Sequence, residues 1–279
     1  MKKGTLTTVL LIVVLVVGLS LLIYPKFSDY WNKSVQSKAV ASYIDSIEDM
    51  DEDKYAEIWN SAIDYNKKLL ERPNQYKLTE ELAKRYMNEL SISDGGMMGY
   101  IEIPKIEVYL PIYHTTNENV LQVAIGHIDW TSLPTGGAST HTVLSSHRGL
   151  PSAKLFTDLD RMQVGDVFML WIMDECLTYE VDQILIVEPD ESEALQVEKG
   201  KDLCTLVTCT PYGINSHRLL VRGHRIDNIE AAEVVRVTAD AMVIDKLVVV
   251  PFVLVPILLC MFVALLVSTG KKKNRRNVK

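Results

Sequence analysis

Two uncharged apolar runs, one near each end of the chain, constrain its architecture most. Residues 4–25 and 247–270 contain no Asp, Glu, Lys or Arg, and each exceeds the roughly 20 apolar residues that cross a bilayer core of about 30 Å. We therefore expect two membrane-spanning helices, although the first run could instead be a cleaved signal peptide. Proline is tolerated in such helices, so Pro251 and Pro256 do not argue against the second span.

Charge is divided unequally between the ends and the middle of the chain. Eight of the 29 Lys and Arg residues lie outside the apolar runs at the extreme ends, which leaves 21 for the middle against all 36 acids, a net charge of −15. Positively charged flanks predict that residues 1–25 begin and the basic tail 271–279 ends on the cytoplasmic side, with the middle outside the cell. A domain this acidic is a poor nucleic-acid binder.

Glycine and proline divide the middle of the chain into a helical part and a strand-rich part. Residues 26–95 are polar and helix-forming, with an interruption at Pro73 and a helix expected from Thr79 to Leu90, and we interpret them as a stalk. After Gly95-Gly96, residues 96–228 alternate strand-like runs with turns. Residues 229–246 are expected to form a helical linker to the second span.

The strand-rich part predicts a mainly β domain, either a closed barrel or a sandwich, with short helices at Asn117–Ile125 and Ser152–Leu159. Seven strand-like runs are rich in Val, Ile, Leu, Thr and Tyr: Gly99–Ile103, Val108–Tyr113, Thr142–His147, Val167–Ile172, Leu177–Val187, Leu203–Cys209 and Arg218–Arg222.

Three cysteines lie outside the apolar runs, so they cannot all pair with one another. Cys204 and Cys209 share one predicted strand, where about 16 Å would separate them, beyond the reach of a disulfide. Pairing of Cys176 with either of them stays open.

The strand that ends at Cys209 carries the main chemical signal. A Pro-Tyr-Gly turn follows at residues 211–213, so the thiol would face loops at the edge of a sheet, where functional sites usually lie. Taken alone, this segment fits a buried structural cysteine equally well.

A cysteine nucleophile needs a proton-transfer partner and a donor for the developing oxyanion. His147 ends one predicted strand and Arg218 begins another, so three strand ends would meet at one rim. His141 is the nearest rival to His147, because strand alternation places both on one face. The other competing histidines are His114, His127, His217 and His224.

Other chemistries lack support in the sequence. The patterns G-x-S-x-G, C-x-x-C and H-E-x-x-H are absent, so we predict neither a serine hydrolase nor a zinc site, and no cofactor. Six acids in apparent turns are interpreted as solvated loop residues rather than a calcium site: Asp174, Glu175, Glu188, Asp190, Glu191 and Glu193.

The chain resembles the sortases, membrane-anchored cysteine transpeptidases of Gram-positive bacteria, and in particular the pilin-polymerising class C sortases. The resemblance is dense between Gly96 and Ile226, and the two terminal spans also look like class C. The segments that carry it are Gly99–Ile106, Leu133–Gly137, Ser146–Phe156, Thr205–Gly213 and Asn215–Gly223.

Matched residue by residue, the resemblance implies that Cys209 is the nucleophile, His147 the general acid and base, and Arg218 the oxyanion-stabilising residue. It also implies a closed eight-stranded β-barrel. Class C sortases usually carry an Asp-Pro-aromatic lid before the barrel, whereas here the nearest match lacks the Asp and has its aromatic residue displaced. This candidate lid consists of Arg72, Pro73, Asn74, Gln75 and Tyr76.

The implied activity is cleavage of an LPxTG-like sorting signal between Thr and Gly, with transfer of the acyl group to a pilin lysine. The partners would be secreted pilin or surface proteins that carry this signal, and a lysine-bearing acceptor pilin. One alternative is a housekeeping-type sortase that anchors surface proteins to cell-wall peptidoglycan. A more distant alternative is a membrane-tethered β-domain that binds proteins without catalysis.

Overall fold

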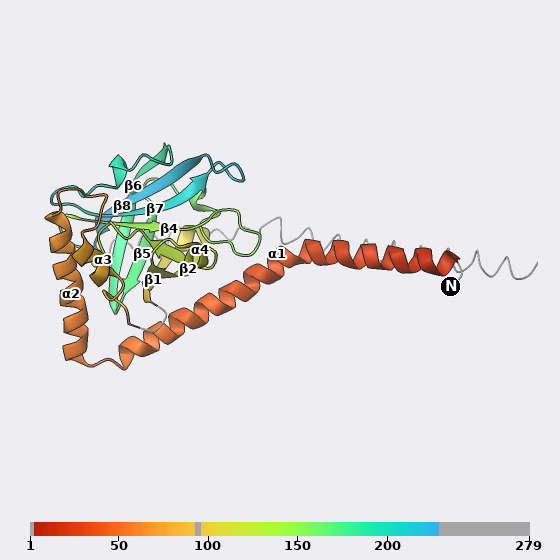
Figure 1. Ribbon diagram of the computed structural model, residues 1–279, viewed down its shortest axis with the longest axis horizontal. Helices are drawn as coiled ribbons and strands as arrows, with labels where there is room; N and C mark the ends of the chain where they lie inside the picture. The colour runs from red at the N-terminus through yellow and green to blue at the C-terminus, as the bar shows by residue number, and fades with distance from the viewer. Residues whose placement is uncertain (1–2, 93–95, 229–279) are drawn as a thin grey trace, which may run out of the picture. The chain divides into compact units, whose positions relative to one another are not determined.

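The computed structural model describes residues 3–92 and 96–228 of the chain. The predicted linker 229–246, the second predicted span 247–270 and the tail 271–279 lie outside the described residues. Eight strands form a closed barrel in the order β1-β2-β3-β4-β7-β8-β6-β5, as the resemblance implied (Figure 1). Their bounds are β1 Met97–Ile103, β2 Val108–His114, β3 Ile125–His127, β4 Thr140–Ser145, β5 Val167–Ile172, β6 Glu175–Val187, β7 Asp202–Thr210 and β8 His217–Ile226.

Seven of these strands correspond to the seven runs of branched and aromatic residues in the sequence, and β3 is the one that the sequence did not reveal. Most neighbours are antiparallel, but β2 pairs with β3 and β4 pairs with β7 in parallel. The parallel pair β4–β7 places the carboxyl ends of both strands at one rim of the barrel. These ends are where His147 and Cys209 lie.

Within residues 3–92 and 96–228, four α-helices occur: α1 Lys3–Glu48, α2 Glu52–Leu70, α3 Glu80–Tyr86 and α4 Glu118–Leu121. Asp51 and Thr79 cap α2 and α3, each accepting a hydrogen bond from a backbone N–H of the first turn. Short 3-10 turns occur at Pro104–Ile106, Leu159–Arg161 and Glu193–Leu195.

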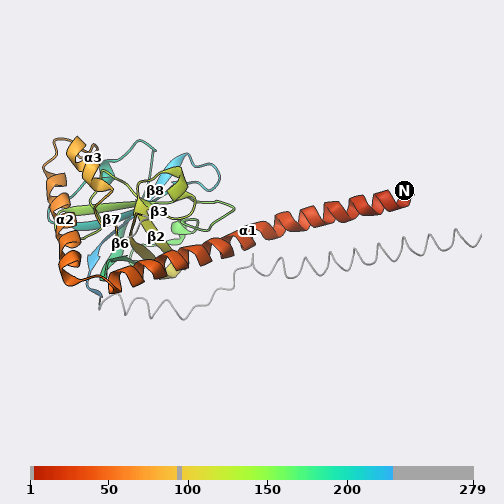
Figure 2. The ribbon, with the colours of Figure 1, turned by 60° about the horizontal axis from the view of Figure 1, so that its bottom comes forward.

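The sequence predicted a helical stalk over residues 26–95. The structure differs, because α2 and α3 pack onto the barrel in both views (Figures 1 and 2). Leu69 of α2 and Leu82 and Tyr86 of α3 are each 3% exposed and belong to the same hydrophobic core as barrel residues such as Ile112. Their apolar side chains are removed from water by the barrel, which stabilises this arrangement over an extended stalk.

Two further predictions need correction. The helix expected at Asn117–Ile125 ends at Leu121 and gives way to β3, and Ser152–Leu159 forms turns that lead into a 3-10 turn at Leu159. Pro151 precedes that second segment, and the backbone carbonyl of Ser152 accepts a bond from Asn32 of α1 rather than from a helical turn. The thiols of Cys176, Cys204 and Cys209 are all free, so the disulfide that the sequence left open is not formed.

The apolar run near the N-terminus lies in α1. Among the described residues, one helix is long and apolar enough to cross a membrane, and it covers Leu10–Glu48. The part of α1 from Ser28 onward belongs to the compact unit that contains the barrel. Tyr43 of this part is 1% exposed, and its hydroxyl donates to the Met98 carbonyl at 2.8 Å.

Candidate active site

Cys209 and Arg218 are paired by the register of two antiparallel strands. In β7 and β8, Val207 faces Leu220 and Cys209 faces Arg218, so the Cys209–Arg218 pair lies two residues beyond an apolar pair on the same face. Directly opposite side chains have Cβ atoms about 4.5–5.5 Å apart, which puts the guanidinium within reach of a group bound at the sulfur. Cys209 is half-buried at this position.

His147 is brought beside Cys209 by the parallel register of β4 and β7. Ser145 pairs with Val207, an offset of 62 residues along the chain. The same offset continues past the end of β4, because Thr208 Oγ1 donates to the Ser146 carbonyl at 2.9 Å and Arg148 contacts Thr210 Oγ1 at 3.4 Å. His147 therefore lies alongside Cys209, about one strand spacing of 4.8 Å away in backbone terms.

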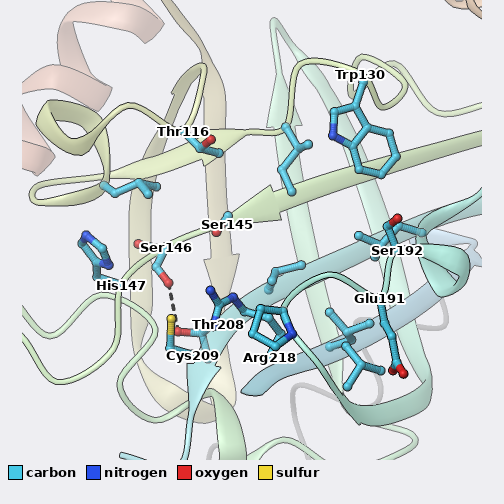
Figure 3. A pocket seen from close by; sticks show the side chains of 17 residues that line it. Thr116, Trp130, Ser145, Ser146, His147, Glu191, Ser192, Thr208, Cys209 and Arg218 are labelled. Atoms are coloured by element: carbon cyan, nitrogen blue, oxygen red, sulfur yellow. Dashed lines mark hydrogen bonds between the residues drawn. The ribbon is translucent and has the colours of Figure 1, made fainter. Parts of the chain in front are cut away.

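The three predicted residues line one groove of about 330 Å³. Figure 3 shows His147 and Cys209 at one side of this groove, Arg218 beside Cys209, and Trp130 at the opposite side. Five apolar residues contribute to the rest of the lining: Ile128, Val187, Leu195, Val207 and Leu220. The groove thus combines a candidate reactive end, which carries a thiol, an imidazole and a guanidinium, with apolar lining residues suited to a peptide's nonpolar side chains.

A carboxylate contacts the His147 ring at this end of the groove. His147 Nε2 lies 3.4 Å from Glu118 Oε2, and Gln122 donates to the other oxygen of Glu118 at 3.0 Å. These contacts hold the pKa of the Glu118 carboxyl below its usual value, first through Gln122 and then through His147. The exposed Glu118 carboxylate at the start of α4, itself bonded by Gln122 just after this helix, thus contacts one nitrogen of the His147 ring.

A buried arginine joins the loops that follow β4 and β7. The side chain of Arg148 is 7% exposed, forms an ion pair with Asp160, and lies 5.8 Å from the centre of the Tyr212 ring. Gly149 adopts φ +76°, and a Cβ there would lie 2.9 Å from the Tyr212 ring. The chain after His147 thus needs glycine to pass the loop that follows Cys209.

The rival histidine and the second strand cysteine are structural. His141 is 1% exposed and bonds through its two ring nitrogens to the Gln196 carbonyl and to Thr205 Oγ1, and burial lowers its pKa. Cys204 is fully buried in the core, and burial raises the pKa of its thiol well above the usual value. A neutral, buried thiol is a poor nucleophile, so Cys204 is not a competitor of Cys209.

The candidate lid Arg72–Tyr76 does not cover Cys209 in this structure, since none of its described residues lines the groove. Arg72 donates to the Trp130 carbonyl at 3.0 Å, and the Tyr76 ring packs edge-on against the Trp130 ring, with 5.4 Å between centres. The segment therefore lies behind the apolar end of the groove rather than over its reactive end.

Sequence reasoning missed Trp130 and Glu118. Trp130 lies in a loop with no periodic pattern to mark it, and its place in the groove depends on segments that are distant in sequence. Glu118 falls within a predicted helix, but only the register of β4 brings His147 to it.

A family model described as the Sortase domain matches residues 101–226 of the chain. Among curated proteins, sortase D of Bacillus subtilis (strain 168) is 27% identical over 160 residues, which cover 56% of this chain and 78% of that protein. Sortase A of Bacillus anthracis is 25% identical over 223 residues, or 80% of this chain and 96% of that protein.

Solved structures of class C sortases are more similar. Sortase C1 from Streptococcus agalactiae is 52% identical with a TM-score of 0.66, covering 68% of this chain and 99% of that one. Sortase C from Streptococcus pneumoniae is 42% identical with a TM-score of 0.62, covering 68% of this chain and 97% of that one. The chain therefore belongs to the sortase family of cysteine transpeptidases and, within it, to class C.

Proposed function

We propose that this chain is a membrane-anchored pilin transpeptidase that cleaves an LPxTG-like sorting signal at Thr–Gly and transfers the acyl group to a lysine of the next subunit. The observation that carries this proposal is the meeting of Cys209, His147 and Arg218 on one groove whose other lining residues include several apolar ones. Such a groove offers nonpolar contacts to a Leu-Pro segment while the thiol reaches the carbonyl that follows it.

In the first half-reaction, Cys209 gives its thiol proton to His147, and its sulfur attacks the Thr carbonyl carbon to form a tetrahedral intermediate. Arg218 stabilises its oxyanion. Nη1 of Arg218 bonds to the carbonyls of Asn215 and His217, and no other bond of its guanidinium occurs among the described residues. The C–N bond then breaks, His147 protonates the departing glycine amine, and a thioester remains on Cys209.

In the second half-reaction, the lysine amine attacks the thioester carbonyl. His147 takes the proton that the amine loses, the C–S bond breaks, and an isopeptide bond forms as the Cys209 sulfur is released. The two half-reactions use the same groups in reverse order, so one site suffices for both.

The choice of a pilin lysine as acceptor rests on the relatives. The Streptococcus pneumoniae sortase C structure is described as informing pilin substrate specificity, and another neighbour, 40% identical, is sortase C1 of a pilus island. A Clostridium perfringens sortase C, 41% identical, was solved with its C-terminal cell wall sorting motif. These names support an LPxTG-like donor and a pilin acceptor for this chain.

A membrane location is supported by the same family and by the apolar helix at the N-terminus. We propose that α1 anchors the chain, that the barrel is extracytoplasmic, and that both termini are cytoplasmic, with the second span supplied by residues 247–270. Secreted subunits would then meet the groove on the outer side of the membrane.

The test is intact-mass spectrometry of the full chain in detergent with an LPxTG peptide and a lysine-bearing pilin acceptor. We expect an acyl adduct on the wild-type enzyme that resolves onto the lysine, and no adduct on Cys209→Ala, with a loss of activity of about 10³-fold or more. Cys204→Ala, on the same strand, is the matched control and should keep the adduct.

Two results would contradict the proposal. An adduct that resolves only onto a peptidoglycan-type amine would assign the housekeeping activity instead. Full activity in Cys209→Ala would remove the thioester mechanism, and the absence of both adduct and transfer product with the wild type would leave a binding domain.

A further inference from the structure

The groove has two walls at its apolar end, and they come from different loops. The loop between β3 and β4 supplies Ile128 and Trp130, and the loop between β6 and β7 supplies Leu195 together with the polar residues Glu191 and Ser192. Neither wall is a strand, so the distance between the two loops depends on contacts other than the hydrogen bonds between the barrel strands. Trp130, being only partly buried, presents its indole to the groove (Figure 3).

The segment 72–76 touches both walls from behind. On one side, Arg72 Nη2 donates to the Trp130 carbonyl at 3.0 Å and the Tyr76 ring packs against the indole. On the other side, Gln75 Oε1 accepts from the Val197 N–H at 3.2 Å, and the Tyr76 hydroxyl accepts a hydrogen bond from the Gln196 amide. Tyr76 is therefore in contact with both loops at once.

The segment is itself held in shape by its own polar groups. Arg72 Nε donates to the Leu69 carbonyl at 2.7 Å and Nη1 to the Lys77 carbonyl at 3.3 Å, so one guanidinium closes the turn and reaches Trp130. Asn74 Oδ1 accepts from the Tyr76 N–H at 2.9 Å, which orders the backbone before the tyrosine. A preformed segment loses little entropy in holding the two loops.

We propose that residues 72–76 form a clasp that positions Trp130 against the apolar residues of the sorting signal, with Arg72, Gln75 and Tyr76 as positioning residues and Trp130 as a specificity-determining residue. This inference rests on the proposed function, because it names the part of the groove that reads the donor peptide upstream of its Thr. It assigns the segment to substrate binding rather than to covering Cys209.

The experiment measures steady-state kinetics of the full chain in detergent with an LPxTG peptide, together with the rate at which iodoacetamide alkylates Cys209. We expect Tyr76→Ala to raise KM about fivefold to tenfold, since aromatic pairs are worth roughly that factor, while kcat changes less than about twofold. The rate of Cys209 alkylation in Tyr76→Ala should equal that of the wild type, because iodoacetamide is too small to contact the apolar end of the groove.

Two further measurements separate positioning from a general loss of stability. Tyr76→Phe keeps the ring and loses only the hydrogen bond from Gln196, so its KM should lie between those of wild type and Tyr76→Ala. A peptide whose Leu is replaced by Ala should be used by wild type and Tyr76→Ala with similar kcat/KM, because neither then gains from Trp130. Tyr109→Ala is the matched control, since Tyr109 is 41% exposed against 37% for Tyr76 and lies on β2.

The clasp is overturned if KM is unchanged in both Tyr76 variants, or if the Leu-to-Ala peptide still separates Tyr76→Ala from wild type. Faster alkylation in Tyr76→Ala would also overturn it, because a segment that shields Cys209 is a lid. These results are distinct from failure of the proposed function, in which the wild-type enzyme itself forms no acyl adduct.

Discussion

At the scale of single residues, His127 shows how a histidine is kept neutral for structural use. It is fully buried, and burial lowers its pKa to about 4. Nε2 lies 2.9 Å from the Ser132 carbonyl and so carries the hydrogen, while Nδ1 accepts from the Tyr86 hydroxyl at 2.9 Å. The ring thereby ties α3 to the loop that carries Trp130.

This lowered pKa predicts loss of stability in acid. The unfolded chain takes up a proton on His127 near pH 6.5, but the folded chain does not until about pH 4. Between these values the unfolded state binds more protons, so stability should fall by up to about 3 kcal/mol as the pH is lowered across this window. Urea unfolding of the compact unit Ser28–Asp240 at several pH values measures the slope.

The control is His127→Gln, which should be less stable at pH 7 but show a shallower slope between pH 6.5 and 4. A residual slope is expected from His141, whose pKa is also lowered by burial. Parallel curves for the wild type and the variant would show that His127 does not account for the acid sensitivity.

At the scale of elements, the shortest strand, β3, is needed to close the barrel. β3 has three residues, yet it joins β2 to β4 and so closes that side of the barrel. Gly126 at its centre packs so closely that an added Cβ would lie 2.3 Å from the backbone oxygen of Thr115. Strand β4, which leads to His147, therefore depends on a glycine in its neighbour.

Gly126→Ala should accordingly lower the free energy of unfolding by more than about 2 kcal/mol, because backbone must move to accept the methyl group. Denaturant unfolding of the same fragment measures it. Gly200→Ala is the comparison, since its Cβ would meet nothing within 4 Å and only its φ of +81° is unfavourable, at a cost of about 1 kcal/mol. Equal losses of stability in both variants would mean that the added methyl group at Gly126 is accommodated next to the Thr115 backbone without strain.

At the scale of the whole molecule, the helices before the barrel are part of its core. The sequence led us to a stalk because residues 26–95 are polar overall and the apolar side chains that pack inward are widely spaced. The contacts of Leu69, Leu82 and Tyr86 are with strands far along the chain. Local pattern cannot reveal such contacts.

Other features were accessible to sequence. Long strands such as β5 and β7 were found because their branched residues run continuously, whereas β3 escaped because three residues that include a glycine carry no period. Cys209, His147 and Arg218 were predicted to meet because each stands at a strand end, and the structure places all three on one groove. Trp130 was not predicted from the sequence, because its position in the groove depends on contacts between segments that are distant along the chain.

Packing of α3 on the barrel can be tested within the fragment Ser28–Asp240. Leu82→Ala should destabilise it by about 2–4 kcal/mol, because a side chain 3% exposed leaves a cavity in the shared core. Lys84→Ala, two residues away with a side chain 75% exposed, should change stability by less than about 0.5 kcal/mol. Thermal or urea unfolding measures both changes in stability. An unchanged stability in Leu82→Ala would favour the interpretation of this segment as a stalk that does not pack on the barrel.

The constant offset of 62 residues between β4 and β7 has a consequence for how this enzyme can diverge. The backbone positions of His147 and Cys209 are set by hydrogen bonds between adjacent strands, not by the length of the chain that joins them. Insertions and deletions between β6 and β7 would change this offset but not the pairing of β4 with β7, so they would not by themselves separate His147 from Cys209. Enzyme engineers can exchange that loop to alter peptide preference while the chemistry stays in place.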